Sequence, residues 1–482
     1  MNETDPVSPR RADDDPQAHT GDAAAPRRPA ASPASPTSPV EIAGPADAEP
    51  KGAAEAPRPR RRTTAWLVGG VAALVVIGLI VWSVLQQPAA PTAAPSVSDS
   101  GTPSPSASVS QPPALTDAQL IATTELAKVR TKTSWTVQAP AATGVPTQPA
   151  CVELSATGGA SPDAELNRLF TAAKGDGTIL QVVQAWPDAT SATTAFNALL
   201  TQAGSCTDGL LRSADRVTGL ADAATVLTVQ TGDGATHTLL FVRSGRFVSL
   251  VDGGVPAGAD ALAVNAVVTA SRASQGRQCG PASGTCPTNP NTVGTAPPPT
   301  ETIGWLAWVD LPRVTSGAGT WTATEPLAPK LIGSQCENVN LNKLSGATES
   351  LHRTYLLTND PKAPEGFGID EAVYSYAKAS GASDMAKQLA KNFDGCGERT
   401  RTATVKDASV TAPATNGKDL KATSYLVTQR VSEARTVTFR VGIAAIGDKL
   451  VYLLANPSDK FDFSDDAWKA IVGRATQRVT QS

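Results

Sequence analysis

Few residues of this chain have types and spacing that could carry chemistry. His237 and His352 could each act as a general base, but no serine elbow or cysteine partner accompanies them. Asp465 and Asp466 form an acidic pair in SDDAW. We expect this pair at a helix N-terminus, where the helix dipole stabilises negative charge. A pair of glycosidase carboxylates stays open, because only geometry decides it. The sequence predicts no catalytic residue and a protein that is not an enzyme.

The glycine-rich stretches resemble phosphate loops only superficially. GDGTIL (175–180) and GDGATH (232–237) lie between β-type runs, which favours hairpin turns. The chain has three histidines and no Cys-x-x-Cys, so we expect no metal site and no cofactor. The net charge of −3 lacks the basic excess that nucleic-acid binding needs, so no nucleic-acid partner is expected.

The elements that would position any site are predicted twice along the chain. Each unit has an opening apolar helix, a tryptophan, a cysteine, a helix that ends in a second cysteine, a strand meander and a closing helix. This order predicts an α+β fold, in which each domain is an antiparallel sheet with helices on one face. The helices are expected at 116–129, 191–206 and 259–272 in the first unit, and at 302–311, 381–396 and 465–477 in the second.

The domain boundaries follow from composition. We expect the first domain at 114–288 and the second at 301–482. A Pro/Thr-rich stretch at 289–300 is expected to be the linker between them. Residues 1–64 have almost no large apolar side chains and are expected to be a disordered tail, whereas the Pro/Ser-rich residues 86–113 are expected to be a stalk.

Residues 65–85 contain no charge and are predicted to be one transmembrane helix. At ~1.5 Å per residue this segment matches the thickness of a hydrocarbon core. Arginines at 58, 60, 61 and 62 precede it and no charge follows directly, so the N-terminus is expected in the cytoplasm and the two domains outside. A cleaved signal peptide is the rival interpretation, but its n-region would be unusually long. The predicted location is a single-pass protein of the cell membrane.

All six cysteines follow the predicted membrane helix, in an oxidising compartment, where an even number indicates disulfides. Within each unit, one cysteine precedes a strand and the next ends a helix. The simplest pairing would bind each helix to its neighbouring strand, and a third pair would close a short loop beside the linker. A redox or metal site is the alternative for that pair. The expected pairs are Cys151–Cys206, Cys336–Cys396 and Cys279–Cys286.

Four tryptophans of the folded part occupy informative positions. Trp135 and Trp321 recur at equivalent places in the two units, which indicates core anchors rather than ligand-stacking residues. Trp305 and Trp308 lie three residues apart on the helix expected at 302–311. One of this second pair is expected to pack on the sheet, and the other to be exposed for a partner.

A stretch of the first unit, VVQAWPDATSATTAFNALLTQAGSC, resembles the PknH-like extracellular sensor domain family. The second unit, YSYAKASGASDMAKQLAKNFDGC, lacks the Trp–Pro but keeps the helix and the cysteine. The resemblance covers about 114–275 and 301–480, as a tandem pair. The matching positions are Val183, Trp186, Pro187, Ala189, Ala192, Ala195, Phe196 and Cys206, with Cys396 in the second unit.

The resemblance implies a disulfide-stapled α+β fold with a cleft that senses a ligand at the envelope. Two departures from the family are evident. Members usually hold two disulfides per domain, whereas the repeated pattern here supplies one cysteine pair per unit. The sensor of family members is also often fused to a cytoplasmic kinase. Residues 1–64 contain neither a Gly-rich loop nor the kinase lysine and aspartate motifs.

The sequence therefore predicts a membrane-anchored, extracytoplasmic, sensor-type protein that binds an envelope ligand or protein without catalysis. Two alternatives stay open: a hydrolase of cell-wall glycan or peptide, and an envelope scaffold with a phosphorylatable cytoplasmic tail. The sequence identifies neither the ligand, nor the partner protein, nor the oligomeric state.

Overall fold

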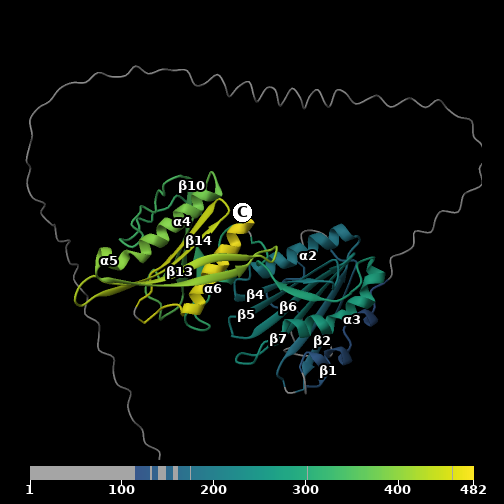
Figure 1. Ribbon diagram of the computed structural model, residues 1–482. Coiled ribbons are helices and arrows are strands. Elements are labelled where there is room, and N and C mark those ends of the chain that lie inside the picture. The colour runs from purple at the N-terminus through teal and green to yellow at the C-terminus, as the bar shows by residue number, and fades with distance from the viewer. Residues whose placement is uncertain are drawn as a thin grey trace, which may run out of the picture. The chain divides into compact units, whose positions relative to one another are not determined.

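The structure is a computed structural model that describes residues 114–130, 133–138, 148–155, 161–173, 175–300, 302–458 and 460–482 (Figure 1). The predicted tail (1–64), membrane helix (65–85) and stalk (86–113) lie outside these residues. Within the described ranges, no helix has the length and apolar character needed to cross a bilayer.

The first sheet has eight antiparallel strands in the order β1-β2-β3-β7-β6-β5-β4-β8. Helix α2 (Ala189–Gly204) follows β3, and α3 (Val264–Ala282) follows β7. The strands are β1 (Trp135–Val137), β2 (Ala164–Ala172), β3 (Thr178–Ala185), β4 (Gly209–Thr218), β5 (Ala223–Thr231), β6 (Thr236–Ser244), β7 (Phe247–Val255) and β8 (Asn291–Gly294).

The second sheet has seven antiparallel strands in the order β12-β13-β14-β15-β11-β10-β9. Its helices are α4 (Ala379–Asp394), the short α5 (Cys396–Thr400) and α6 (Asp465–Arg478). The strands are β9 (Thr320–Ala323), β10 (Ala347–Thr358), β11 (Gly368–Tyr376), β12 (Ala403–Pro413), β13 (Asp419–Arg430), β14 (Thr436–Ile446) and β15 (Lys449–Ala455).

The two sheets repeat one topology. Reading β9 to β12 across the second sheet reproduces the path from β1 to β4 across the first, with the last strand of each meander in the centre. In both, a helix enters after the third strand and another follows the meander. The α+β class and the internal duplication are therefore confirmed, and β8 is the one strand that the first sheet adds.

The expectation that helices cover one face of each sheet is wrong. In β6, Leu239 and Phe241 share a core with α2, whereas Leu240 and Val242 share a different core with α3. Because successive side chains of a strand point to opposite faces, α2 and α3 cover opposite sides of the sheet. The second sheet repeats this between α4 and α6 (Figure 1). The central strands read as continuous apolar runs because both of their faces are buried.

The two opening helices are also absent as α-helices. Residues 116–129 form two 3₁₀ turns, Asp117–Gln119 and Thr123–Lys128. Between them the backbone is extended at Leu120, and the amide of Ile121 donates to Gln181 Oε1 at 2.6 Å. In the second unit only Trp308–Asp310 forms a 3₁₀ turn. Hydrogen bonds to the neighbouring sheet replace the intrahelical ones at both places.

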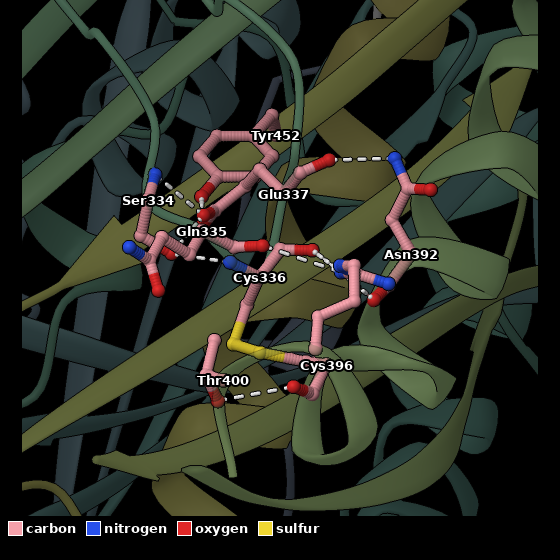
Figure 2. The surroundings of a disulfide bond; sticks show 9 residues. Ser334, Gln335, Cys336, Glu337, Asn392, Cys396, Thr400 and Tyr452 are labelled. Atoms are coloured by element: carbon pink, nitrogen blue, oxygen red, sulfur yellow. Dashed lines mark hydrogen bonds between the residues drawn. A yellow bond between two sulfur atoms is a disulfide. The ribbon is translucent and has the colours of Figure 1, made fainter. Parts of the chain in front are cut away.

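The three disulfides pair as expected: Cys151–Cys206, Cys279–Cys286 and Cys336–Cys396. Figure 2 shows the last of these, which fixes the loop before β10 to the start of α5. Beside it, the buried carboxylate of Glu337 accepts from Tyr452 Oη at 2.6 Å, and Asn392 donates to the Glu337 carbonyl at 2.6 Å (Figure 2). In the loop-entropy account, closing a loop of this length stabilises the fold by about 4 kcal/mol.

The predicted linker, 289–300, is built into the fold. Residues 291–294 form β8, which pairs with β4, and Thr295–Pro298 are buried. The chain then passes between the cores of the two sheets, and its successive side chains pack alternately into one core and the other. Ala307 and Val309 belong to the core of the first sheet, while Leu306 and Leu311 belong to that of the second. The two duplicated units are thus packed together through this segment.

A buried ion cluster fastens this junction. Asp310 Oδ2 lies 2.7 Å from Arg478 Nε, and its Oδ1 lies 3.3 Å from Arg474 Nε. The side chains of Asp310 and Arg478 have no exposed surface. Both arginines, which come from α6 of the second unit, also donate to first-unit carbonyls: Arg474 to Leu211 and Arg478 to Gly204. Removing the aspartate would leave two buried charges without their counter-ion.

We predict that Asp310→Asn lowers the free energy of unfolding by about 3–5 kcal/mol, because the buried arginines lose their carboxylate. Urea denaturation of the full chain in detergent, followed by tryptophan fluorescence, measures this. Asp465→Asn is the control, since Asp465 is largely exposed beside Arg440 and such pairs contribute at most about 1 kcal/mol. Equal losses in the two variants would contradict the role given to Asp310.

Candidate functional site

The first histidine considered as a base is paired with a carboxylate. His237 Nδ1 lies 2.8 Å from Asp252 Oδ1, across β6 and β7. Asp252 Oδ2 accepts the amide of Ala150, next to the first disulfide. Burial opposes protonation of His237, but the bond and charge of Asp252 outweigh it and raise the pKa of the ring. No hydroxyl or thiol nucleophile bonds to this ring within the described ranges.

The second histidine belongs to a three-residue cluster that is not a catalytic relay. His352 Nε2 lies 2.8 Å from Asp370 Oδ1, and Thr354 Oγ1 donates to that same oxygen at 2.7 Å. In a relay, the imidazole stands between the hydroxyl and the carboxylate. Here the hydroxyl and the ring converge on one carboxylate oxygen, so the cluster ties β10 to β11 instead.

The remaining residues of possible chemical interest are structural. Asp465 opens α6 and lies 2.8 Å from Arg440 Nη1, and this contact lowers the pKa of Asp465. Residues 232–234 form the turn of the β5–β6 hairpin, as expected. Across the part of the chain that the structure describes, no cluster of three or more His, Cys, Asp or Glu side chains could hold a metal ion.

The two tryptophans proposed for partner binding have different surroundings. They do not share a helix, because the backbone between them is extended. Trp305 is buried, whereas Trp308 is half-buried and lines two hollows at the junction. Of this pair, Trp308 is therefore the one placed to meet a small molecule. Trp135 and Trp321 are buried, as expected of core anchors.

The first of these hollows, which we name the outer hollow, has a volume of about 280 Å³. Its walls come from both units. The first unit contributes the start of β4 and the β5–β6 turn, and the second contributes the segment from Trp308 to Trp321. The lining residues are Thr207, Gly209, Leu210, Arg212, Gln230, Thr231, Gly232, Gly234, Trp308, Leu311, Pro312, Arg313, Val314, Ser316, Gly317 and Trp321.

Two arginines make the outer hollow cationic. Arg313 crosses the junction, where it donates to Asp208 Oδ1 at 2.9 Å and to the Gly319 carbonyl at 3.0 Å. Arg212 has Gln230 as its hydrogen-bond partner and no carboxylate within 4.0 Å in the described residues. Partial burial lowers the pKa of Arg212, which remains a cation at neutral pH. Arg212 therefore has charge available for a ligand.

Two further residues of the outer hollow, Trp321 and Gly232, have close packing contacts. Trp321 packs against Phe463 and Phe367, and its buried indole Nε1 has no hydrogen-bond partner. Gly232 lies against the ends of the Asp208 and Arg313 side chains, so a larger side chain there would have to displace that ion pair.

Sequence reasoning identified Trp308 but not the arginines. Arg212 and Arg313 are single basic residues in unremarkable contexts, LLRSA and LPRVT. They meet because β4 of the first unit and the crossing segment of the second are brought together at the junction. A helix at 302–311, had it formed, would have placed Trp308 differently, so no local pattern could have revealed this cluster.

Behind the junction segment lies a buried carboxyl group, Glu371 of β11. Its Oε2 accepts from the Leu306 amide at 3.1 Å and from Tyr355 Oη at 2.7 Å, while Oε1 has no partner. Burial raises the pKa of Glu371 to about 7, although these two bonds and the charge of Arg353 oppose the rise. Glu371 therefore fixes the path of the chain just before Trp308.

Comparison with known proteins gives one structural likeness to report. No model of a protein family matches the chain, and no curated protein matches its sequence. The chain is similar to the crystal structure of the extracellular domain of PknH from Mycobacterium tuberculosis, at 13% sequence identity and a TM-score of 0.21. The match covers 32% of this chain and 84% of that chain. Over part of its length the chain thus has structural similarity to that extracellular domain, as the sequence resemblance implied.

We predict that Glu371→Gln changes how stability depends on pH. Glu371 has a folded pKa of about 7 and an ordinary value of 4.5, so its contribution is present below 4.5 and is lost as pH rises through 7. The loss is on the order of 3 kcal/mol. Glutamine keeps the accepting oxygen without this titration.

Urea denaturation of both proteins at about pH 5 and about pH 8 measures the effect. The stability of the variant relative to the parent should rise between the two pH values. The contribution of His237 is common to both proteins and cancels in the comparison. An unchanged difference between the two pH values would show that Glu371 is already ionised in the folded protein.

Proposed function

We propose that the chain is a membrane-anchored, extracytoplasmic binding protein that holds a small acidic ligand in the outer hollow. The observation that carries this proposal is the composition of that hollow, whose lining includes Trp308, Trp321 and one arginine from each unit. Small-molecule sites commonly lie between packed units and combine an aromatic wall with a few polar groups.

The charges of the outer hollow favour a particular ligand chemistry. Guanidinium groups bind carboxylates and phosphates with paired hydrogen bonds. The faces of indole rings stack on flat or apolar surfaces such as those of sugars. Arg313 is already bound to Asp208, so Arg212 is the cation that a ligand would engage. A small acidic sugar or a related carboxylate satisfies both features.

The proposed location rests on the disulfides and the predicted membrane helix. Three disulfides without a free cysteine in the described residues are consistent with an oxidising compartment outside the cytoplasm. The proposed membrane anchor is the apolar segment 65–85, which precedes the duplicated units in the sequence. The hollow would then face the envelope, where acidic glycans occur.

The hydrolase alternative has less support from the geometry. It would use Asp465 or His352, but each is already bound to another side chain, Arg440 or Asp370. The scaffold alternative depends on residues 1–64, which lie outside the described residues. A binding role in the outer hollow is therefore the function that the described contacts favour.

We predict that N-acetylmuramic acid binds the full chain in detergent more tightly than N-acetylglucosamine, which lacks the carboxylate. Tryptophan fluorescence and titration calorimetry report this binding, because Trp308 and Trp321 line the hollow. Arg212→Met should weaken binding of the acidic sugar roughly tenfold, the contribution of one charge-assisted hydrogen bond.

Arg216→Met is the matched control, since Arg216 is an exposed arginine on the same strand but outside the hollow. This control should bind as the parent does. Equal affinities for the two sugars, or an Arg212→Met variant with unchanged affinity, would refute the proposed function in this hollow.

A further inference from the structure

A second hollow lies on another side of Trp308 and is distinct from the outer one. This inner hollow has a volume of about 190 Å³, below the roughly 300 Å³ at which drug-sized ligands fit. Trp308 is the residue that it shares with the outer hollow. Its lining residues are Ser205, Thr300, Thr302, Leu306, Ala307, Trp308, Glu325, Arg353 and Tyr355.

The central feature of the inner hollow is a buried arginine without an acidic partner. Arg353 is 6% exposed, and its Nε donates to the Thr324 carbonyl at 2.8 Å. Its guanidinium lies 5.3 Å from the ring centre of Tyr355 and 6.0 Å from that of Trp308. No carboxylate of the described residues is within 4.0 Å of it. Such an arrangement desolvates a cation and holds it in place without a direct ion pair.

A hydroxyl group gives a second, independent indication of a ligand. Ser205 lies just after α2 of the first unit and lines the inner hollow. Its buried Oγ has no hydrogen-bond partner. Buried polar atoms of this kind are usually paired, and an acceptor on a ligand in the same hollow would pair this hydroxyl. An anionic oxygen would satisfy both groups.

The rim of the inner hollow narrows the ligand class. Glu325 is exposed, lines the same hollow and forms no ion pair with Arg353. A second negative group on the ligand would be repelled by Glu325, whereas an ammonium group would be attracted. The lining of the hollow therefore combines a buried cation, two aromatic rings and an exposed anion.

We propose that the inner hollow is a binding site for a small zwitterion, an α-amino acid or the end of a very short peptide. The carboxylate binds Arg353 and Ser205, and the ammonium group faces Glu325. This site lies beside the outer hollow and does not depend on the function proposed there.

The groups beneath Arg353 set the strength of this site. Glu371 and Asp310 are the acidic groups whose charges act on this part of β10 and β11, together with the hydroxyl of Tyr355. An ionised Glu371 partly balances the charge of Arg353 and competes with an incoming carboxylate. Replacing Glu371 by glutamine removes that competitor while keeping its accepting oxygen, so binding of the zwitterion should become stronger.

Titration calorimetry of the full chain in detergent with four probes tests the site. Alanine should bind, alaninamide should not because it lacks the carboxylate, and propionate should bind more weakly because it lacks the ammonium group. Alanyl-alanine distinguishes a free amino acid from the end of a peptide as the ligand. It should bind as well as alanine only if the hollow accepts the end of a peptide. Equal binding of alanine and alaninamide would overturn the proposal.

Three variants complete the test. Arg353→Met should weaken alanine binding at least tenfold. Glu325→Gln changes an exposed residue and leaves the fold intact, and it should abolish the preference for alanine over propionate. Arg212→Met, in the outer hollow, should leave alanine binding unchanged while it weakens binding of the acidic sugar. Retained alanine affinity in Arg353→Met, or a retained preference in Glu325→Gln, would refute the assignment.

Discussion

The carboxylate of Asp310 holds the two duplicated units together. It is buried between Arg474 and Arg478, and these arginines also bind backbone carbonyls of the first unit. A buried ion cluster contributes little net stability compared with apolar packing, but it tolerates only one arrangement of its members. The segment that carries Asp310 also carries Trp308, which lines both hollows. The cluster therefore adds a buried polar constraint to the apolar packing of Ala307 and Val309 in the first core.

Duplication supplied the framework, and the differences between the copies supplied the candidate sites. Both sheets have the same strand order, and both bind a helix to a neighbouring segment through a disulfide. The first copy adds β8, and the proline-rich residues after it are buried against the second copy. Arg212 and Trp308 lie where the two copies meet. Arg353 of β10 has a counterpart in Arg168 of β2, since they pair across their sheets with Glu371 and Gln181, but only Arg353 lines a hollow shared with the other copy. A binding role for the junction thus requires both copies.

Much of the framework could be predicted from the sequence, because its signals are local. The helices that end at Cys206 and Cys396, the hairpin turns and the cysteine pairs follow from short-range patterns, and the structure contains them. The prediction of two opening helices was wrong. Apolar spacing alone cannot show that the backbone amide of Ile121 or Leu306 will donate to a side chain of a distant strand. The prediction that helices cover one face of each sheet was also wrong. The sequences of β6 and β15 are continuous apolar runs, and such runs indicate strands that are buried on both faces.

The sites were less predictable than the fold. Arg353 and Arg212 are isolated arginines on strands, and nothing near them in the sequence distinguishes them from surface residues. Their significance depends on which groups lie opposite, and those groups come from the other unit or from a crossing segment. Only Trp308 had a local signal, a second tryptophan three residues away, and that signal was attached to a helix that does not form.

The position of α6 has a consequence for how the protein reaches its final state. Arg478 binds the carbonyl of Gly204, which lies 274 residues earlier, and it also binds that of Pro298. Because synthesis starts at the N-terminus, the first sheet is available to fold long before this helix is made. The strands of the first sheet can pair early, but the face of the first unit at the junction stays exposed to water until α6 packs against it. Assembly of the junction is therefore a late step in folding, and the walls of the two hollows come together only at that step.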